Sequence, residues 1–176
     1  VLIGFLNLLI NSLQLNSINP KNNSKICSWD ILSQNEINSK INKATDAQLS
    51  WETLRLHNRL RYVNELSSIL KEKSKEFSIL MADEMGKPIS QGKSEIDKCV
   101  NLCNYYNQNA INLLSKNNIE TEYLKSYVSY RPIGLVFGIM PWNFPFWQVL
   151  RFSIPALIVG NGILVKHASN VQGCAN

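Results

Sequence analysis

The sequence predicts an α/β fold, in which a helical first half leads into a strand–helix–strand unit. Two apolar segments, 134–140 and 160–165, have the length of strands and are separated by a polar turn and an apolar run of helical length. Over residues 34–115, in contrast, apolar side chains recur at helical spacing. The chain has 176 residues, which is enough for one domain with a core of its own.

The elements before and at the first helix are short and carry local signals. Residues 17–24 are rich in Ser, Asn and Pro and predict a turn, and residues 25–29 predict a short strand. Ser33 and Glu36 have the spacing of a capping box, in which each side chain bonds the backbone N–H of the other residue. A helix is therefore predicted over about 34–49.

Two longer helical regions follow. Residues 52–84 carry an apolar face, and this region is predicted to break near Ser74 because an unbroken helix of that length is unusual in a compact domain. Gly86 suits the position after a helix end, and Pro88 suits the first turn of a new helix. That new helix is predicted over 89–115.

The second half of the chain is predicted to contain three strands. Residues 120–130 place tyrosines and a valine among polar neighbours and predict an exposed or edge strand. Residues 133–139 predict a buried strand, and the run to Val165 predicts the next, with Lys166 at its end. Parallel strands joined by a helix end at one edge of the sheet, which is where open sheets bind ligands.

The charge pattern argues against nucleic acid as a partner. The net charge is +5, but lysines and arginines are scattered and alternate with acids. Such a distribution favours a solvated surface over a surface for an anionic partner. Since no recognition motif accompanies the charge, we expect no binding to nucleic acid.

The cysteines indicate a reducing compartment. Cys99 and Cys103 are one helical turn apart and could share a face, whereas Cys27 and Cys174 stand alone. Two thiols and the two histidines of the chain do not make a zinc site, so no metal is expected. Buried reduced thiols in a cytoplasmic protein are the favoured interpretation.

Residues 1–16 are expected to be an atypical apolar leader or a translated upstream extension. Val1 to Leu15 carry no charged side chain. The segment is shorter than the roughly 20 residues of a transmembrane helix, and it lacks the positive region and small-residue cleavage site of a secretory signal. A helix that associates with membranes is the alternative.

Asn143 is the first candidate for chemistry. It lies between Pro141 and Pro145, which restrict the turn after the first strand of the unit. An asparagine side chain held rigidly at a strand end can donate an N–H to a developing oxyanion. Capping the following helix is the alternative, and it is a common role of asparagine. Spacing alone does not decide between the two.

Lys166 and Arg151 are the charged candidates near the same sheet edge. Lys166 can bond the ribose or phosphate of a nucleotide, or it can be an ordinary surface lysine; no Gly-x-Gly-x-x-Gly fingerprint is present. Arg151 comes eight residues after Asn143 within an apolar helix. It is expected to need an internal acid or an anionic ligand as its partner.

Five segments of the chain form a wider pattern: Ile18–Pro20, Glu84–Pro88, Tyr130–Gly134, Pro141–Pro145 and Lys166–Ser169. In this order and at this spacing they resemble the N-terminal part of an aldehyde dehydrogenase, close to the succinate-semialdehyde dehydrogenase branch, and the Pro-Trp-Asn-Phe-Pro block is the most specific of them. The resemblance covers residues 17–176. It implies helices packed around the first strands of a Rossmann-like cofactor-binding domain. It also implies a homo-oligomeric full-length protein that uses residues 120–132 as an oligomerisation strand.

The resemblance also implies a role for each site residue. Asn143 matches the asparagine that helps to form the oxyanion hole. Ser169 falls where NAD-preferring members often carry Glu, so NADP is expected to be tolerated as well as NAD. The residues implied to contact the cofactor are Ile139, Met140, Pro141, Trp142, Lys166, His167, Ala168 and Ser169. Those implied to contact a short carboxylated aldehyde are Phe144, Trp147, Gln148 and Arg151, the last through the distal carboxylate.

By the same resemblance, the catalytic cysteine and the general-base glutamate of the family lie beyond residue 176. Cys174 matches a non-catalytic position and is not expected to be the nucleophile. Without thiolate and base there is no covalent intermediate. The chain is therefore expected to be a fragment of an NAD(P)-dependent aldehyde dehydrogenase that is inactive alone. The alternative is a non-catalytic remnant that binds nucleotide or associates with other subunits.

Overall fold

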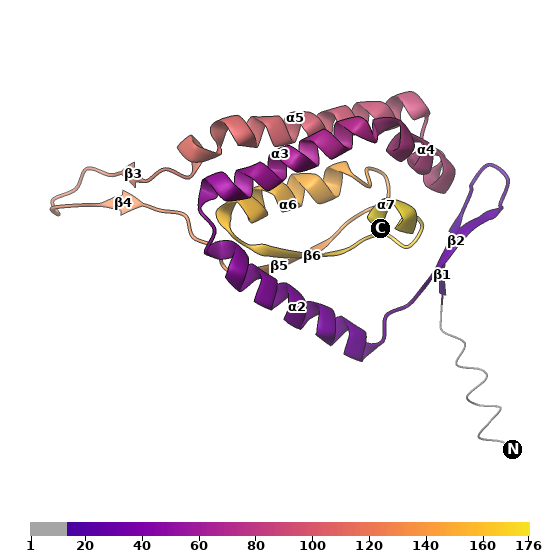
Figure 1. Cartoon of the computed structure of the whole chain (residues 1–176), viewed down its shortest axis with the longest axis horizontal. Coiled ribbons are helices and arrows are strands. Elements are labelled where there is room, and N and C mark those ends of the chain that lie inside the picture. Colours follow the sequence, from indigo (N-terminus) through magenta and orange to yellow (C-terminus); the bar gives the residue numbers. More distant parts are fainter. Residues whose placement is uncertain (1–13) are drawn as a thin grey trace, which may run out of the picture.

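The computed structural model describes residues 14–176 and confirms the predicted α/β fold (Figure 1). Helices lie on both sides of a small parallel sheet, and two hairpins project at opposite ends of the molecule. In chain order the elements are β1 (Gln14–Ile18), β2 (Lys25–Asp30), α2 (Gln34–Glu52), α3 (Leu56–Glu72), α4 (Ser74–Met85), α5 (Ile89–Leu113), β3 (Asn117–Asn118), β4 (Tyr127–Val128), β5 (Leu135–Ile139), α6 (Trp147–Val159), β6 (Gly162–Lys166) and α7 (Gln172–Ala175).

The predicted strand–helix–strand unit is confirmed. Strands β5 and β6 are parallel and pair from Leu135 opposite Gly162 to Ile139 opposite Lys166. Helix α6 connects them, and it ends at Gly160, whose φ of 115° is a left-handed conformation that suits glycine. Both strands therefore end at the same edge of the sheet.

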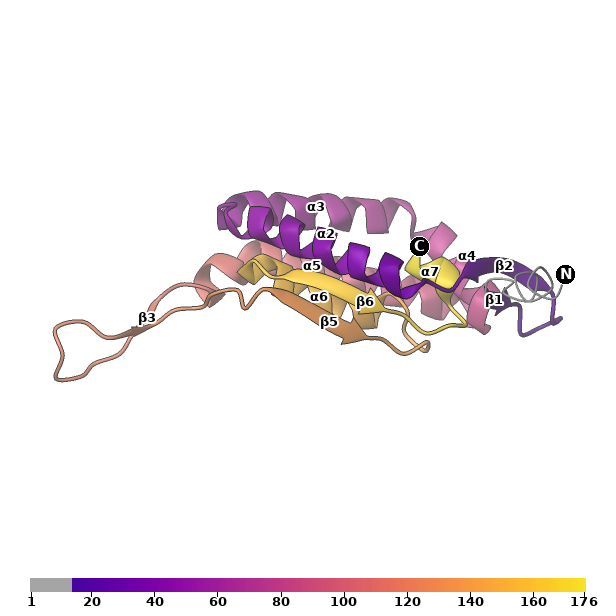
Figure 2. The same ribbon diagram turned by 90° about the horizontal axis from the view of Figure 1, so that it is seen from below.

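The prediction that residues 133–139 form a buried strand is wrong in its burial. Phe137 and Ile139 on β5 are 60% and 70% exposed. Gly138 lies against Phe152 of α6, whereas Gly162 lies against α2. Helix α6 thus covers one face of the sheet, and α2 covers the opposite face only in part (Figure 2). A two-stranded sheet has too few neighbours among the described residues to bury both faces.

Side chains of α2 and α3 fix the end of α6 and the start of β6. Trp51 Nε1 donates to the carbonyl oxygen of Leu157 at 2.8 Å. Arg59 Nε donates to the carbonyl oxygen of Ile158 at 3.0 Å. These donors satisfy carbonyl groups that a helix leaves unpaired in its last turn. They set the position from which β6 begins.

The predicted helices are confirmed, with shifts at their ends. The helix predicted over 34–49 runs on to Glu52. Its capping box forms as expected, with Ser33 N–H donating to Glu36 Oε2 at 2.8 Å and Glu36 N–H donating to Ser33 Oγ at 3.3 Å. The predicted break near Ser74 occurs at Lys73. Helix α5 ends at Leu113 rather than near residue 115.

Helices α3, α4, α5 and α6 enclose the core. Met81, Ile96 and Ile154 are among its fully buried side chains. Cys99 and Cys103 belong to the same cluster and are free thiols, which confirms the prediction of buried reduced cysteines.

The prediction of a strand over 120–130 is wrong for most of its length. Only Tyr127–Val128 is a strand, and it pairs antiparallel with Asn117–Asn118. The connecting loop projects from the helical body (Figures 1 and 2) and exposes Tyr123 and Leu124. A longer strand needs a longer partner, and the described part of the chain offers only two residues for it.

A second hairpin, β1–β2, lies at the other end of the molecule. The strand predicted over 25–29 is confirmed as β2. The last residues assigned to the leader, 14–16, belong to β1, while the leader prediction for residues 1–13 falls outside the described residues. Across residues 14–176 we find no helix with the length and apolarity to cross a bilayer.

Candidate active site

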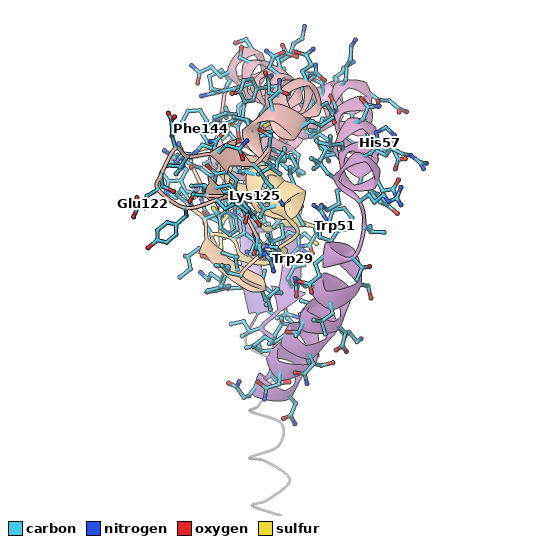
Figure 3. All side chains as sticks on the ribbon, turned by 90° about the vertical axis from the view of Figure 1, so that its left-hand side faces the viewer. Trp29, Trp51, His57, Glu122, Lys125 and Phe144 are labelled. Carbon is cyan, nitrogen blue, oxygen red and sulfur yellow. The ribbon has the colours of Figure 1, made fainter. Side chains whose placement is uncertain are left out.

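The turn between β5 and α6 presents two aromatic residues and an asparagine at the surface. Trp142 and Phe144 are 50% and 42% exposed, and Asn143 between them is exposed as well. Pro145, by contrast, is fully buried. Figure 3 shows Phe144 at the surface on the side of the molecule away from His57, with Glu122 and Lys125 of the hairpin loop projecting toward the viewer. The turn therefore exposes three consecutive residues and ends in a buried proline.

The alternative interpretation of Asn143 as a helix cap is wrong. Helix α6 begins at Trp147, its N-cap position is Phe146, and no side chain of the N-cap residue bonds its first turn. The backbone N–H groups of Phe146 and Trp147 instead donate to Oε1 of Glu95, at 2.9 Å each. The Glu95 carboxylate from α5 thus caps α6, and it complements the positive end of the helix dipole.

A buried ion pair lies beneath this turn, and the sequence reasoning missed it. Lys87 Nζ forms a salt bridge with Glu95 and donates to the carbonyl oxygen of Asn143 at 2.8 Å. The same ammonium lies 4.2 Å from the centre of the Phe144 ring, a cation–π contact. One signal was present: Glu95 falls at helical spacing with Cys99 on the buried face of α5.

His167 also supports the turn from inside. Its Nε2 is bonded to the carbonyl oxygen of Pro145 at 2.9 Å, and Ala168 N–H donates to its Nδ1 at 2.9 Å. Because Nδ1 accepts, the ring proton lies on Nε2 and points to the carbonyl. Both ring nitrogens are thus bonded to backbone groups of the protein, so any contact of residue 167 with a cofactor would be made by its backbone.

The predicted cofactor residues gather at the carboxyl edge of the sheet. Ile139 and Lys166 are opposite each other in register, both are exposed, and paired positions of adjacent strands point to the same face. The backbone N–H of Met140 donates to the carbonyl oxygen of Lys166 at 3.0 Å, which joins the two strands just past Ile139. Ser169, also exposed, follows three residues after Lys166.

A groove of about 480 Å³ adjoins this edge, on the face that α2 covers only in part. Its walls are mostly apolar side chains of α2, β5 and β6, and Lys40 and Lys166 are its charged members. Mostly apolar walls with a few polar groups are common in small-molecule sites, and a lysine at the carboxyl end of a strand can donate to the ribose or phosphate of a nucleotide. The residues present at this edge therefore fit such a ligand.

The predicted substrate residues occupy the start of α6. Gln148 N–H donates to the carbonyl oxygen of Phe144 at 3.0 Å, which begins the helix. Trp147 is half-buried, and Lys98 Nζ lies 4.0 Å from the centre of its ring. Arg151 is exposed one turn later, on the helical face of Trp147. The structure thus groups these four residues on one turn and helix start.

The cysteines with raised pKa values do not have the properties of a catalytic nucleophile. Burial, with a further contribution from the neighbouring Glu84 carboxylate, raises the pKa of Cys174 far above its usual value. Burial likewise raises the pKa of Cys99 to about 12 and that of Cys103 to about 11. The reactive form of a catalytic cysteine is the thiolate, which these environments disfavour.

Glu84 explains the position of Cys174. Its carboxylate accepts the backbone N–H groups of Gly173 and Cys174 at 2.7 and 2.9 Å and the hydroxyl of Ser17 at 2.6 Å. These bonds join α4, α7 and β1 on the interior. Within residues 14–176, no three His, Cys, Asp or Glu side chains lie close enough together to bind a metal ion.

Comparison with known proteins points to one family. The family model of the aldehyde dehydrogenases matches residues 10–176. The chain is 38% identical over 159 residues to a probable NADP+ succinate-semialdehyde dehydrogenase of Synechocystis sp., and 34% identical over 159 residues to the NAD(P)+ succinate semialdehyde dehydrogenase Sad of Escherichia coli. Each alignment covers 90% of this chain but only 35% and 34% of the relative, so the chain spans about a third of their length.

Solved structures give the same result for the fold. Succinic semialdehyde dehydrogenase from Streptococcus pyogenes, determined with NADP+, superimposes with a TM-score of 0.88 at 26% identity. A structure of Gox0499 superimposes with a TM-score of 0.90, also at 26% identity. Both matches cover 92% of this chain and 36% of the other.

Proposed function

Because the chain belongs to the aldehyde dehydrogenase family, we propose that it supplies the oxyanion donor and part of the cofactor and substrate contacts of an NAD(P)-dependent dehydrogenase. The substrate is a short carboxylated aldehyde such as succinate semialdehyde, which is oxidised to the acid. The relatives from Synechocystis and Escherichia coli are both named as succinate-semialdehyde dehydrogenases, and this supports the choice of substrate.

The observation that carries the proposal is the state of Asn143. Its backbone carbonyl is bonded from the interior, its side chain is exposed, and the helix-capping role that would otherwise occupy it is filled by Glu95. A fixed side-chain N–H donor beside a reacting aldehyde stabilises the negative charge that develops on the carbonyl oxygen, which is worth about 3–4 kcal/mol in comparable sites.

We propose that the carboxyl edge of the sheet binds an adenosine ribose with or without a 2′-phosphate. Lys166 supplies a donor to the adenosine ribose, and the backbone from Ile139 to Trp142, with His167 and Ala168, completes the contact surface. Ser169 has no charge to repel a 2′-phosphate, so NADP is accepted as well as NAD. When bound, the nicotinamide supplies the acceptor for the hydride. The chain's own residues bind and orient it.

Arg151 is proposed to pair with the distal carboxylate of the substrate, and Phe144, Trp147 and Gln148 to line the approach. The exposed guanidinium at the start of an otherwise apolar helix supports this role. A planar fork of donors matches a carboxylate in two parallel hydrogen bonds. In an active enzyme that contains this chain, Arg151→Met is expected to raise the KM for succinate semialdehyde while leaving the KM for an uncharged aldehyde of equal length unchanged.

We further propose that residues 1–176 are inactive by themselves. The chain spans about a third of the relatives it matches, and burial raises the pKa of Cys99 and Cys174, which disfavours their thiolate forms. Purified chain should show no aldehyde oxidation with NAD or NADP, and turnover by it would contradict this. The second candidate, a non-catalytic remnant, would also be inactive; it differs in that no downstream sequence would restore turnover.

A chimera tests the main proposal. The chain is joined after Asn176 to the remaining part of the Synechocystis relative, and oxidation of succinate semialdehyde is followed by NADPH absorbance. Asn143→Ala is expected to lower kcat by a factor of about 10²–10³ with little change in KM. Asn101→Ala, at an exposed position of α5, is the matched control. Equal kcat values for the two variants would refute the role of Asn143.

Cofactor choice is measured in the same chimera. Comparable kcat/KM for NAD and NADP is expected, and Ser169→Glu should shift the ratio toward NAD. A strict preference for NAD in the chimera with Ser169 unchanged would refute this part of the proposal.

A further inference from the structure

Two buried side chains of opposite charge lie directly beneath the turn that carries Asn143. Lys87 follows Gly86, which ends α4 in a left-handed conformation with φ 73°, and Glu95 lies in the second turn of α5. The two residues are 6% and 3% exposed and form a salt bridge. A buried ion pair gives little net stability compared with a well-packed apolar pair, so stability alone does not account for it.

Both members of the pair are bonded to the turn itself. Lys87 Nζ donates to the carbonyl oxygen of Asn143 at 2.8 Å. On the other side of Pro145, Oε1 of Glu95 accepts the N–H groups of Phe146 and Trp147 at 2.9 Å each. The pair therefore holds one peptide group before the proline and two after it.

These bonds restrain the backbone from the carbonyl group of Asn143 to the N–H of Trp147 without touching the Asn143 side chain. A restrained peptide group directly after a residue limits the directions that its Cα–Cβ bond can take. A third bond from inside, between His167 Nε2 and the carbonyl oxygen of Pro145, restrains the same segment. The Asn143 side chain stays exposed above this arrangement.

We propose that Lys87 and Glu95 are positioning residues that hold Asn143 in the orientation an oxyanion donor needs. The catalytic meaning of this inference rests on the proposed function of Asn143. The geometric claim is that Lys87 is needed as a specific donor to the carbonyl of residue 143, and not merely as a counter-charge for Glu95.

The competing explanation is charge compensation alone. In that case Lys87 would neutralise Glu95, and any change that removes both charges would restore the turn. The two explanations differ in one variant, Lys87→Met with Glu95→Gln. This double change removes the ion pair, yet the glutamine oxygen can still accept the N–H groups of Phe146 and Trp147.

The test uses the 176-residue chain labelled with 15N. Four variants are compared with the unsubstituted chain: K87M, E95Q, the double variant K87M/E95Q, and E84Q as the matched control. Glu84 is as buried as Glu95 and likewise accepts two backbone N–H groups, but those belong to Gly173 and Cys174. The readouts are the side-chain amide signals of Asn143, the exchange rates of the Phe146 and Trp147 amides, and the thermal midpoint.

K87M is expected to shift the Asn143 signals and to lower the midpoint. In E95Q the Phe146 and Trp147 amides are expected to exchange about ten-fold faster or more. The double variant should recover most of the midpoint while its Asn143 signals stay displaced. E84Q should leave the Asn143 signals in place. If K87M does not fold, the double variant still decides.

Two outcomes would overturn the inference. One is a double variant whose Asn143 signals match those of the unsubstituted chain, since Lys87 would then act only as a counter-charge. The other is an E84Q variant that shifts the Asn143 signals as far as K87M does. Because no substrate or turnover is involved, this test can fail while the dehydrogenase assay succeeds, and the reverse also holds.

Discussion

The ammonium group of Lys87 lies 2.8 Å from the carbonyl oxygen of Asn143, although 56 residues separate them in the chain. The bond joins the linker between α4 and α5 to the turn between β5 and α6. A buried charged group therefore restrains the backbone of Asn143, whose side chain is exposed. The helical half of the chain thus supports the turn that carries this residue.

Removal of the Glu95 carboxylate should be strongly destabilising. Glu95→Ala leaves the Lys87 ammonium buried without its partner and leaves two N–H groups without an acceptor, which is expected to lower the free energy of unfolding by about 3–5 kcal/mol. Glu76→Ala is the control, because the salt bridge of Glu76 with Lys73 is exposed and should contribute less than about 1 kcal/mol. Urea unfolding of both variants measures the difference; similar losses would contradict the prediction.

The free energy of unfolding should decrease at alkaline pH. Burial raises the pKa of Cys99 from 9.0 to about 12 and that of Cys103 to about 11. The thiols ionise more readily in the unfolded chain, so their contribution is fully present below about pH 8–9 and is lost as the pH rises toward these values, by about 1 kcal/mol per pH unit for each thiol. Urea titrations from pH 7 to 11 measure it.

The control for this pH dependence is a variant with Ala at both positions, Cys99→Ala with Cys103→Ala. It should be less stable at pH 7 because two core side chains are shortened, but its stability should decline less steeply with pH. An unchanged slope would show that other groups cause the alkaline loss.

Thiol labelling should separate Cys27 from the other three cysteines. Cys27 is exposed on β2, whereas Cys99 and Cys103 are buried and Cys174 is partly buried. A disulfide reagent at neutral pH is expected to modify Cys27 quickly and the others only after unfolding. Mass spectrometry of the labelled peptides identifies the sites. Rapid modification of Cys174 in the folded chain would contradict this prediction.

The hairpin loop should promote self-association of the chain. Leu124 is fully exposed and Tyr123 is 72% exposed on a projecting segment, and exposed apolar hairpins with unpaired edges tend to associate with other chains. Leu124→Lys is expected to lower the average mass in sedimentation at high concentration. Ile69→Lys, at an exposed position of α3, should change it little. Equal effects would argue against the loop as the contact.

Local motifs of the sequence predicted the fold well because their causes lie within a few residues. Ser33 and Glu36 form the capping box that their spacing predicts. Gly86 ends α4 with a positive φ, as expected of glycine after a helix. The apolar runs around Asn143 became β5, α6 and β6. Only Tyr127–Val128 of the segment 120–130 became a strand, because strand formation depends on a partner that the segment's own residues cannot specify.

The candidate site was predictable only in its exposed part. The turn with Asn143, Lys166 and Arg151 could be located from the sequence, and the capping interpretation of Asn143 could not be excluded. The positions of Lys87 and Glu95 beneath that turn could not be inferred, because contacts across 51 to 56 residues arise from the packing of α5 against α6.

The sequence by itself therefore determined the order of elements, the family pattern and the side chains offered at the sheet edge, since these depend on short-range spacing. Only the tertiary structure decided that Glu95 caps α6 in place of Asn143, that His167 points inward, and that a buried ion pair holds the turn. Each of these depends on which residues, distant in sequence, are packed together in the low-dielectric interior, because a buried charge without a hydrogen-bonded partner is strongly destabilising there.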